Sequence, residues 1–235
     1  MNINKNILNP IICALDTTDL LVAKKLVSQL SNTVGGIKLG LEIITKHGIQ
    51  IVSDFAESGV PIFLDLKFHD IPNTVAAAVR NAASLGVELI TVHANGGEEM
   101  LVSAVEASRE FKNPPKILAV TVLTSLDNND LKNIGISSTP TEQVLRLASL
   151  SQKAGCDGVV CSPREISTLR ENMGNNFMLV VPGIRPLGFN ADDQKRTSTP
   201  QEALRSGANR LVIGRPITKS SNPRKAAENI VAELF

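Results

Sequence analysis

The chain has 235 residues and a formal net charge of +1, from 24 Lys and Arg against 23 Asp and Glu. Hydrophobic residues make up 43% of it, which suffices for a globular core and excludes an intrinsically disordered chain. The near-neutral charge argues against duplex nucleic acid as a partner, and the absence of Trp and Tyr argues against base stacking on single strands.

The apolar stretches of the chain are short. Runs such as Ile117–Val120 fall far below the roughly 20 residues of a membrane-spanning helix, so we expect no membrane association. The first ten residues contain four Asn and lack an apolar stretch, so we expect no secretory signal. The cysteines, Cys13, Cys156 and Cys161, form no C-x-x-C pair, which predicts buried, reduced thiols and a cytoplasmic location.

Short β-branched runs alternate with longer amphipathic stretches along the whole chain. Most of these runs are continuously apolar, which is typical of parallel strands buried on both faces. Their spacing averages about 28 residues, the length of one βα unit. We predict eight strands, over Ile11–Asp16, Gly36–Leu39, Pro61–Lys67, Glu88–His93, Lys116–Leu123, Gly158–Cys161, Phe177–Pro182 and Arg210–Gly214.

The stretches between these runs predict helices. Apolar residues recur at helical spacing over Leu20–Leu30, after polar capping residues at 17–19. Pro72 precedes a second such stretch, Val75–Leu85, at a position where the first turn of a helix tolerates proline. Pro223 opens the last helix in the same way.

Eight βα units predict a single-domain (β/α)8 barrel over residues 1–235. The alternative is an open doubly wound sheet, which usually carries a glycine-rich turn after its first strand, whereas Leu15–Thr18 contains no glycine. The longest irregular stretch, Gly183–Thr199, follows the seventh strand and is a candidate lid, because long idle loops are rare in compact domains.

Polar residues gather where the predicted strands end, which is where barrel enzymes carry their chemistry. Asp65 and Lys67 share a strand face, and Lys38 ends the neighbouring strand; with Asp70 they form an array of alternating charge. An ammonium group between carboxylates can act as a general acid. The alternative is an ion-pair network that only closes the barrel mouth.

Two glycine–arginine turns follow the last two strands, Gly183–Arg185 and Gly214–Arg215, where barrels often bind phosphate. The alternative is a pair of surface arginines after tight turns. His93, at the end of the fourth strand, either orients the charge array or is a core histidine bonded to the backbone. The three His have no zinc-ligand spacing, so no metal site is expected.

Residues 65–74, DLKFHDIPNT, resemble the D-x-K-x-x-D-I-P-N-T signature of the orotidine 5′-phosphate decarboxylase family. The resemblance extends over the whole chain and no motif position departs from it. It includes Ala14–Asp16, Lys38–Gly40, Val92–Ala94, Val122–Ser125, Pro182–Pro186, Asp193–Arg196 and Val212–Pro216. It implies conversion of orotidine 5′-monophosphate to UMP and CO2 in de novo pyrimidine biosynthesis, without metal or organic cofactor.

The resemblance also implies a role for each motif residue. Lys67 would protonate C6 of the pyrimidine, with Asp65 beside the scissile carboxylate and Lys38 and Asp70 completing the array. The remaining substrate contacts would come from Asp16 and Lys38 at the ribose, Thr124 and Ser125 at the base, and Pro182, Gly183, Arg185, Gln194, Gly214 and Arg215 around the 5′-phosphate.

The family resemblance further implies a homodimer, in which Asp70, Ile71 and Thr74 reach into the partner's site. Two alternatives to the decarboxylase remain. One is a Mg2+-dependent sugar-phosphate decarboxylase or aldolase, which shares D-x-K-x-x-D but not the Ile71–Thr74 continuation. The other is a non-catalytic barrel that binds a phosphorylated ligand, which the joint presence of the four charged residues disfavours.

Overall fold

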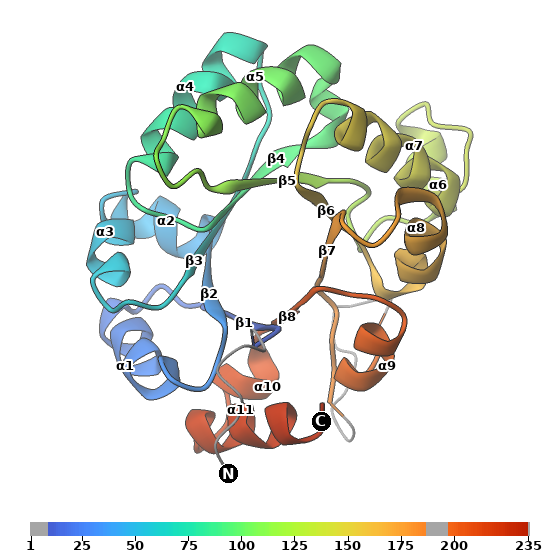
Figure 1. Cartoon of the computed structure of the whole chain (residues 1–235). Helices are drawn as coiled ribbons and strands as arrows, with labels where there is room; N and C mark the ends of the chain where they lie inside the picture. The colour runs from blue at the N-terminus through green and yellow to red at the C-terminus, as the bar shows by residue number, and fades with distance from the viewer. Residues whose placement is uncertain (1–8, 187–196, 235) are drawn as a thin grey trace.

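The computed structural model describes residues 9–186 and 197–234, and the strands in these ranges close into one parallel barrel (Figure 1). The strands follow one another around the barrel in chain order, and β1 (Ile11–Ala14) pairs with both β2 (Gly36–Gly40) and β8 (Arg210–Ile213). This closure confirms the predicted (β/α)8 barrel and excludes the open doubly wound sheet.

All eight predicted strands are present. The other five are β3 (Ile62–Phe68), β4 (Leu89–His93), β5 (Lys116–Val120), β6 (Gly158–Val160) and β7 (Met178–Val181). The fifth ends three residues earlier than predicted, because its pairing with the short β6 runs out at Val120. Thr121 then donates its hydroxyl to the carbonyl of Val160, and the chain leaves the sheet.

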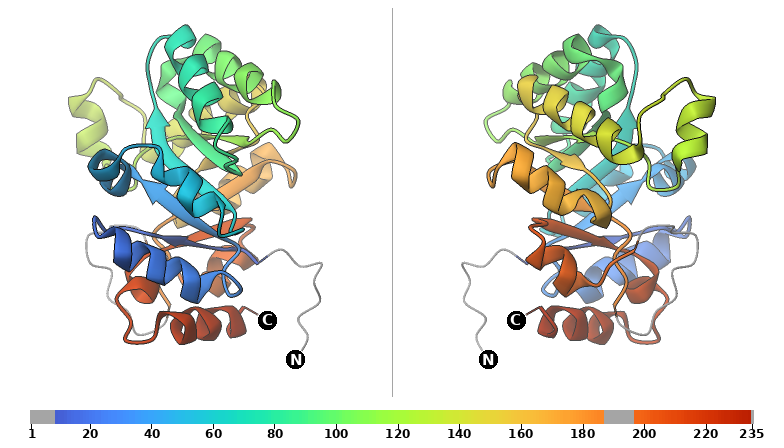
Figure 2. Two further views of the ribbon diagram at one scale, coloured as in Figure 1. Left: turned by 90° about the vertical axis from the view of Figure 1, so that its left-hand side faces the viewer. Right: turned by 90° about the vertical axis from the view of Figure 1, so that its right-hand side faces the viewer.

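The helices form a ring outside the barrel (Figures 1 and 2). They are α1 (Leu20–Leu30), α2 (Leu41–His47), α3 (Ile51–Ala56), α4 (Pro72–Ala83), α5 (Glu98–Arg109), α6 (Asn128–Asn133), α7 (Pro140–Lys153), α8 (Ile166–Met173), α9 (Pro200–Arg205), α10 (Arg215–Thr218) and α11 (Pro223–Ala232), with 3-10 turns at Ala94–Gly96 and Pro163–Glu165. The predicted caps are confirmed: Asp19 accepts from two backbone N–H groups of α1, and prolines open α4 and α11.

Two apolar cores lie on the two faces of the sheet. The larger one packs the ring of helices against the outside of the barrel, and all three cysteines belong to it. The smaller one fills the barrel interior with Ile12, Ala14, Phe63, Leu89, Leu118, Val180 and Val212. Because side chains alternate along a strand, the next inward positions on β2, β3 and β4 are those of Lys38, Asp65 and Thr91, so the barrel interior turns polar toward the carboxyl ends of the strands.

The opposite end of the barrel is held by an ion pair between the buried Arg210 and the partly exposed Glu88. Arg210, on β8, is 3% exposed; it donates to the carbonyl of Asn9 at 2.7 Å and to Glu88 at 3.1 Å. These contacts join the beginning of β1 to the beginnings of β4 and β8. None of the helices in the described part of the chain combines the length and apolar character needed to cross a lipid bilayer.

Candidate active site

A cavity of about 180 Å³ lies above the inner core, at the carboxyl ends of the strands. Its base is apolar, because Phe63, Val160 and Val212 line it and also pack in the barrel interior. Its remaining lining is Lys38, Asp65, Lys67, Val120, Val122, Leu123, Thr124, Cys161 and Pro182. The cavity therefore sets two ammonium groups and one carboxylate against an apolar wall, where charges act more strongly than in water.

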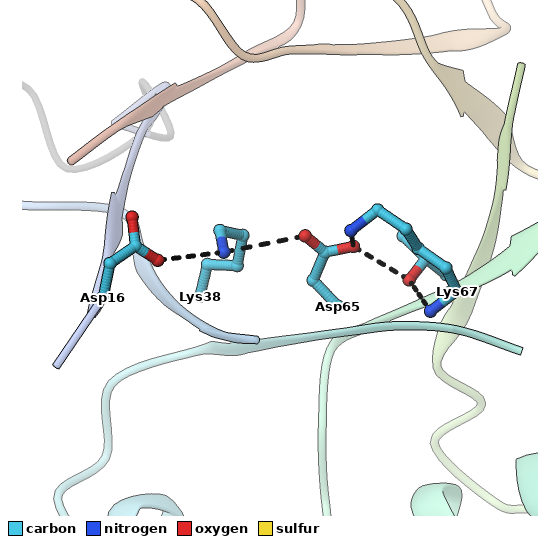
Figure 3. A network of polar contacts seen from close by, with 5 residues as sticks. Asp16, Lys38, Asp65 and Lys67 are labelled. Carbon is cyan, nitrogen blue, oxygen red and sulfur yellow. Dashed lines mark hydrogen bonds and ion pairs between the residues drawn. The ribbon is translucent and has the colours of Figure 1, made fainter. Parts of the chain in front are cut away.

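The charged residues form a row of alternating sign across β1, β2 and β3 (Figure 3). The Nζ of Lys38 lies 3.5 Å from Oδ1 of Asp16 and 3.6 Å from Oδ2 of Asp65. The Nζ of Lys67 lies 2.8 Å from Oδ1 of Asp65. Asp65 is thus held between two lysines and is 13% exposed, whereas Asp16, at the outer end of the row, is 54% exposed.

The Asp65 carboxylate is stabilised in its charged form. Burial by itself raises its pKa, but attraction to Lys38 and Lys67, with hydrogen bonds from Lys67 and Thr91, outweighs burial, so the pKa of Asp65 lies below its ordinary value. The carboxylate consequently stays ionised throughout the neutral range. A negative charge fixed at the cavity wall can repel a second carboxylate placed beside it and can hold an ammonium group in position.

The backbone at Lys67 is irregular. Its φ is 53°, in the left-handed region, and no other non-glycine residue of the described chain has a positive φ. The pairing of β3 with β4 shifts register between Leu64 and Phe68. The spacing of Asp65 and Lys67 correctly predicts that the two side chains meet, but a bulge, rather than regular strand alternation, brings them together.

Thr91 joins this cluster and was not among the residues predicted from the sequence. It is fully buried; its Oγ1 accepts from the backbone N–H of Lys67 at 2.9 Å and lies 3.0 Å from Oδ1 of Asp65, to which it donates. The available signal was its position two residues before His93, on the inward face of the fourth strand. Threonine is common in strands, so that position alone did not distinguish it.

His93 stacks on His69, with ring centroids 5.2 Å apart and planes 22° apart. Within the described residues the Nδ1 of His93 is buried without a hydrogen-bond partner, so a backbone-bonded core histidine does not describe it at that atom. Burial, together with the nearby His69 and Lys67, lowers the pKa of His93. The ring is therefore neutral at physiological pH.

The two glycine–arginine turns follow the paired strands β7 and β8, and the end of β8 approaches Asp16 of the charged row. Gly183 has a φ of 75°, and the strand-like bridge between Ile184 and Ser198 closes the base of the long loop. At Gly214 an added Cβ would lie 3.2 Å from Oδ2 of Asp16, so a larger residue here would press on the Asp16 side chain. Gln194, with positions 187–196 of the candidate lid, lies outside the described residues.

Comparison with known proteins shows the family of the chain. A family model described as "Orotidine 5'-phosphate decarboxylase / HUMPS family" matches residues 9–230. An orotidine 5′-phosphate decarboxylase of Rhodospirillum rubrum is 50% identical over 232 residues, covering 96% of this chain and 94% of the relative. The chain belongs to the orotidine 5′-phosphate decarboxylase family. The same enzyme of Actinobacillus succinogenes is 50% identical over 225 residues, 95% of this chain and 97% of the relative.

A solved structure extends the agreement to the fold. The crystal structure of orotidine 5′-phosphate decarboxylase from Lactobacillus acidophilus has a TM-score of 0.86 and 39% identity, over 96% of this chain and 99% of the other. The predicted family and (β/α)8 fold are confirmed, and the chain is an enzyme of the decarboxylase class. In the described part of the chain, no three or more His, Cys, Asp or Glu side chains are grouped so that they could hold a metal ion.

The remaining residues of the decarboxylase signature, from Asp70 to Thr74, do not line the cavity. Asp70 is exposed, its Oδ1 accepts from the backbone N–H of Ile71 at 2.6 Å, and within the described residues it forms no ion pair. Within one chain, therefore, the second carboxylate of the charged row is Asp16 and not Asp70. Ile71 is 67% exposed and Thr74 is also exposed, so this segment faces outward from the barrel.

The residues expected to contact the pyrimidine lie in the loop after β5. Thr124 lines the cavity, and Ser125, the next residue, is exposed. Cys161 reaches the cavity from the end of β6, but burial raises the pKa of its thiol, which makes it a packing residue rather than a nucleophile. Burial likewise raises the pKa of Cys13 and Cys156 to about 12, in agreement with the predicted buried thiols.

Proposed function

We propose that the chain converts orotidine 5′-monophosphate to UMP and CO2, with Lys67 as the acid. The bond between C6 and the carboxyl carbon breaks, its electron pair stays on C6, and CO2 leaves. Lys67 Nζ then gives one proton to C6 and recovers one from solvent. The observation that carries this proposal is the Lys67 ammonium, 2.8 Å from Asp65 at the wall of the cavity.

The chemistry requires a fixed positive charge. The electron pair left on C6 lies in the plane of the ring, outside its π system, so the ring cannot delocalise it. Preorganised charges in a site that excludes water are the strongest available means of stabilising such a carbanion. Asp65 adds repulsion of the substrate carboxylate, which is relieved as CO2 departs, and we rank carbanion stabilisation by Lys67 first.

We assign the remaining substrate contacts from the resemblance to the family motifs. We assign the ribose hydroxyls to Asp16 and Lys38, which form the outer part of the charged row. Thr124 and Ser125 border the pyrimidine. We assign the 5′-phosphate to the loops after β7 and β8, with Pro182, Gly183, Arg185, Gln194, Gly214 and Arg215. Phosphate binding there can close the lid and so contribute to the transition state, although the phosphate is remote from the reacting bond.

A homodimer completes the proposal. The exposure of Asp70, Ile71 and Thr74 supports their insertion into the site of a partner subunit, where Asp70 would extend the charged row. Mixing Lys67→Ala with Asp70→Ala protein tests this, because mixed dimers then contain one site with both residues intact. Random exchange of subunits should restore about a quarter of wild-type activity if the dimer is symmetric. Activity that stays at the level of the separate variants would contradict a shared site.

The reaction itself is tested by following the ultraviolet absorbance of orotidine 5′-monophosphate, with and without EDTA. We expect loss of the substrate chromophore at the same rate in both, with UMP and CO2 as the only products. Activity that EDTA abolishes and Mg2+ restores would favour the sugar-phosphate alternative. Binding of the nucleotide without turnover would favour the non-catalytic barrel.

A further inference from the structure

The bulge at Lys67 changes which backbone groups pair between β3 and β4. Leu64 pairs with Ile90, and the next pair is Phe68 with Val92. Three residues of β3 therefore lie opposite the single residue Thr91 of β4. Such an insertion interrupts the ladder of backbone hydrogen bonds and leaves the inserted residues to find other partners.

The partner of the Lys67 backbone is the side chain of Thr91. Its hydroxyl oxygen accepts from the Lys67 N–H at 2.9 Å, and the hydroxyl lies 3.0 Å from Oδ1 of Asp65. A hydroxyl has one hydrogen to donate and lone pairs to accept, so both contacts can form at once. The same Oδ1 of Asp65 accepts from Nζ of Lys67 at 2.8 Å, which closes a ring of contacts.

These contacts tie together two ends of one lysine. Thr91 holds the backbone of Lys67 in the left-handed region, which an L-residue occupies only where contacts with its surroundings offset the strain. It also fixes the carboxylate oxygen that receives the ammonium group. Thr91 is fully buried and β-branched, so its own rotamer is restricted and the hydroxyl has little freedom to turn away.

We propose that Thr91 is a positioning residue for the decarboxylation, whose hydroxyl sets the backbone of Lys67 and the carboxylate of Asp65 so that the ammonium group is aimed at the reacting carbon. It contacts neither the substrate nor the reacting atoms in this proposal, and it acts only through these two neighbours. The inference rests on the proposed role of Lys67.

The test compares Thr91→Val, which keeps the shape and removes the hydroxyl, with Thr91→Ser, which keeps the hydroxyl. Because misplacing a catalytic group by about 1 Å can cost on the order of 100-fold, we expect Thr91→Val to lower kcat by about 10- to 100-fold. KM should change by less than about twofold, because the ribose and phosphate contacts are intact. Thr91→Ser should retain most of the wild-type kcat.

Thr121→Val is the matched control. Thr121 is also buried, and its hydroxyl donates to the carbonyl of Val160 at 2.9 Å without contacting Lys67 or Asp65. It should lower the melting temperature much as Thr91→Val does and leave kcat unchanged. An unchanged kcat in Thr91→Val would show that the Thr91 hydroxyl only contributes to packing. The same conclusion would follow if Thr91→Ser and Thr121→Val lowered kcat as much as Thr91→Val does.

A crystal structure of Thr91→Val separates this inference from the proposed reaction. We expect the Lys67 φ to leave the left-handed region or its Nζ to move away from Asp65. Unchanged geometry at both residues would overturn the inference whatever the activity. If wild-type protein fails to decarboxylate the nucleotide, the proposed function is wrong, and the crystal structure still decides whether the hydroxyl positions Lys67.

Discussion

Replacing Lys67 by alanine and by glycine separates its chemistry from its backbone. Both variants remove the ammonium group, and both leave Asp65 paired with Lys38 at 3.6 Å, so we expect both to fold. They lose a general acid, worth about 10²- to 10⁴-fold, and a charge facing the developing carbanion, worth about 10²- to 10³-fold. The two losses together predict a fall in kcat of at least about 10⁴-fold in both variants.

The stabilities of the two variants should differ. Alanine at a φ of 53° retains the left-handed strain of roughly 1–2 kcal/mol, which glycine does not have. Glycine in turn makes the unfolded chain more flexible, at a cost of about 0.4–1 kcal/mol. The difference predicts a glycine variant more stable than the alanine variant by about 1 kcal/mol, or by about 2–4 °C in Tm for a chain of this size.

The assay combines ultraviolet turnover with thermal unfolding. Unfolding is best followed by circular dichroism, because the chain has no Trp or Tyr to serve as a fluorescent reporter. Residual activity above about 1% of wild type in either variant would refute the acid role of Lys67. An alanine variant as stable as the glycine variant, or more stable, would refute the argument that the Lys67 backbone is strained.

Three further predictions concern other parts of the molecule. Arg215→Ala should raise KM and abolish the preference for the phosphorylated over the unphosphorylated nucleoside; an unchanged preference in competition assays would remove Arg215 from the phosphate site. The pKa of Asp65 is lower in the folded than in the unfolded chain, so its stabilisation is present above the unfolded pKa of about 3.9 and is lost as the pH falls through the folded value. Lys38→Met should raise that pKa and move acid unfolding, measured by circular dichroism, to higher pH; an unmoved midpoint would contradict the coupling. Arg210→Ala should cost about 1–3 kcal/mol, because the partly exposed Glu88 and the carbonyl of Asn9 lose their partner, yet preserve kcat at low temperature; a Tm within about 2 °C of wild type would contradict it.

Local patterns in the sequence were sufficient to predict the strands, several helices and the ends at which chemistry gathers. Buried parallel strands leave continuous apolar runs, and helix caps and prolines act within one turn, so both are visible in short windows. The D-x-K-x-x-D-I-P-N-T run added the family and the expected roles of Lys38, Asp65 and Lys67. Strand alternation places Lys38 and Asp65 at inward positions near the strand ends, which made their approach predictable, whereas the bulge of β3 sets the position of Lys67.

Closure and pairing register depended on residues far apart in the chain, and only the tertiary structure decided them. The pairing of β1 with β8 closes the barrel, and the bulge of β3 arises from its register against β4. The contact between Lys67 and Thr91 spans 24 positions, and the one between Lys38 and Asp16 spans 22. No sequence periodicity encodes such a hydrogen bond, because it depends on the register in which two strands pair once the whole barrel is packed.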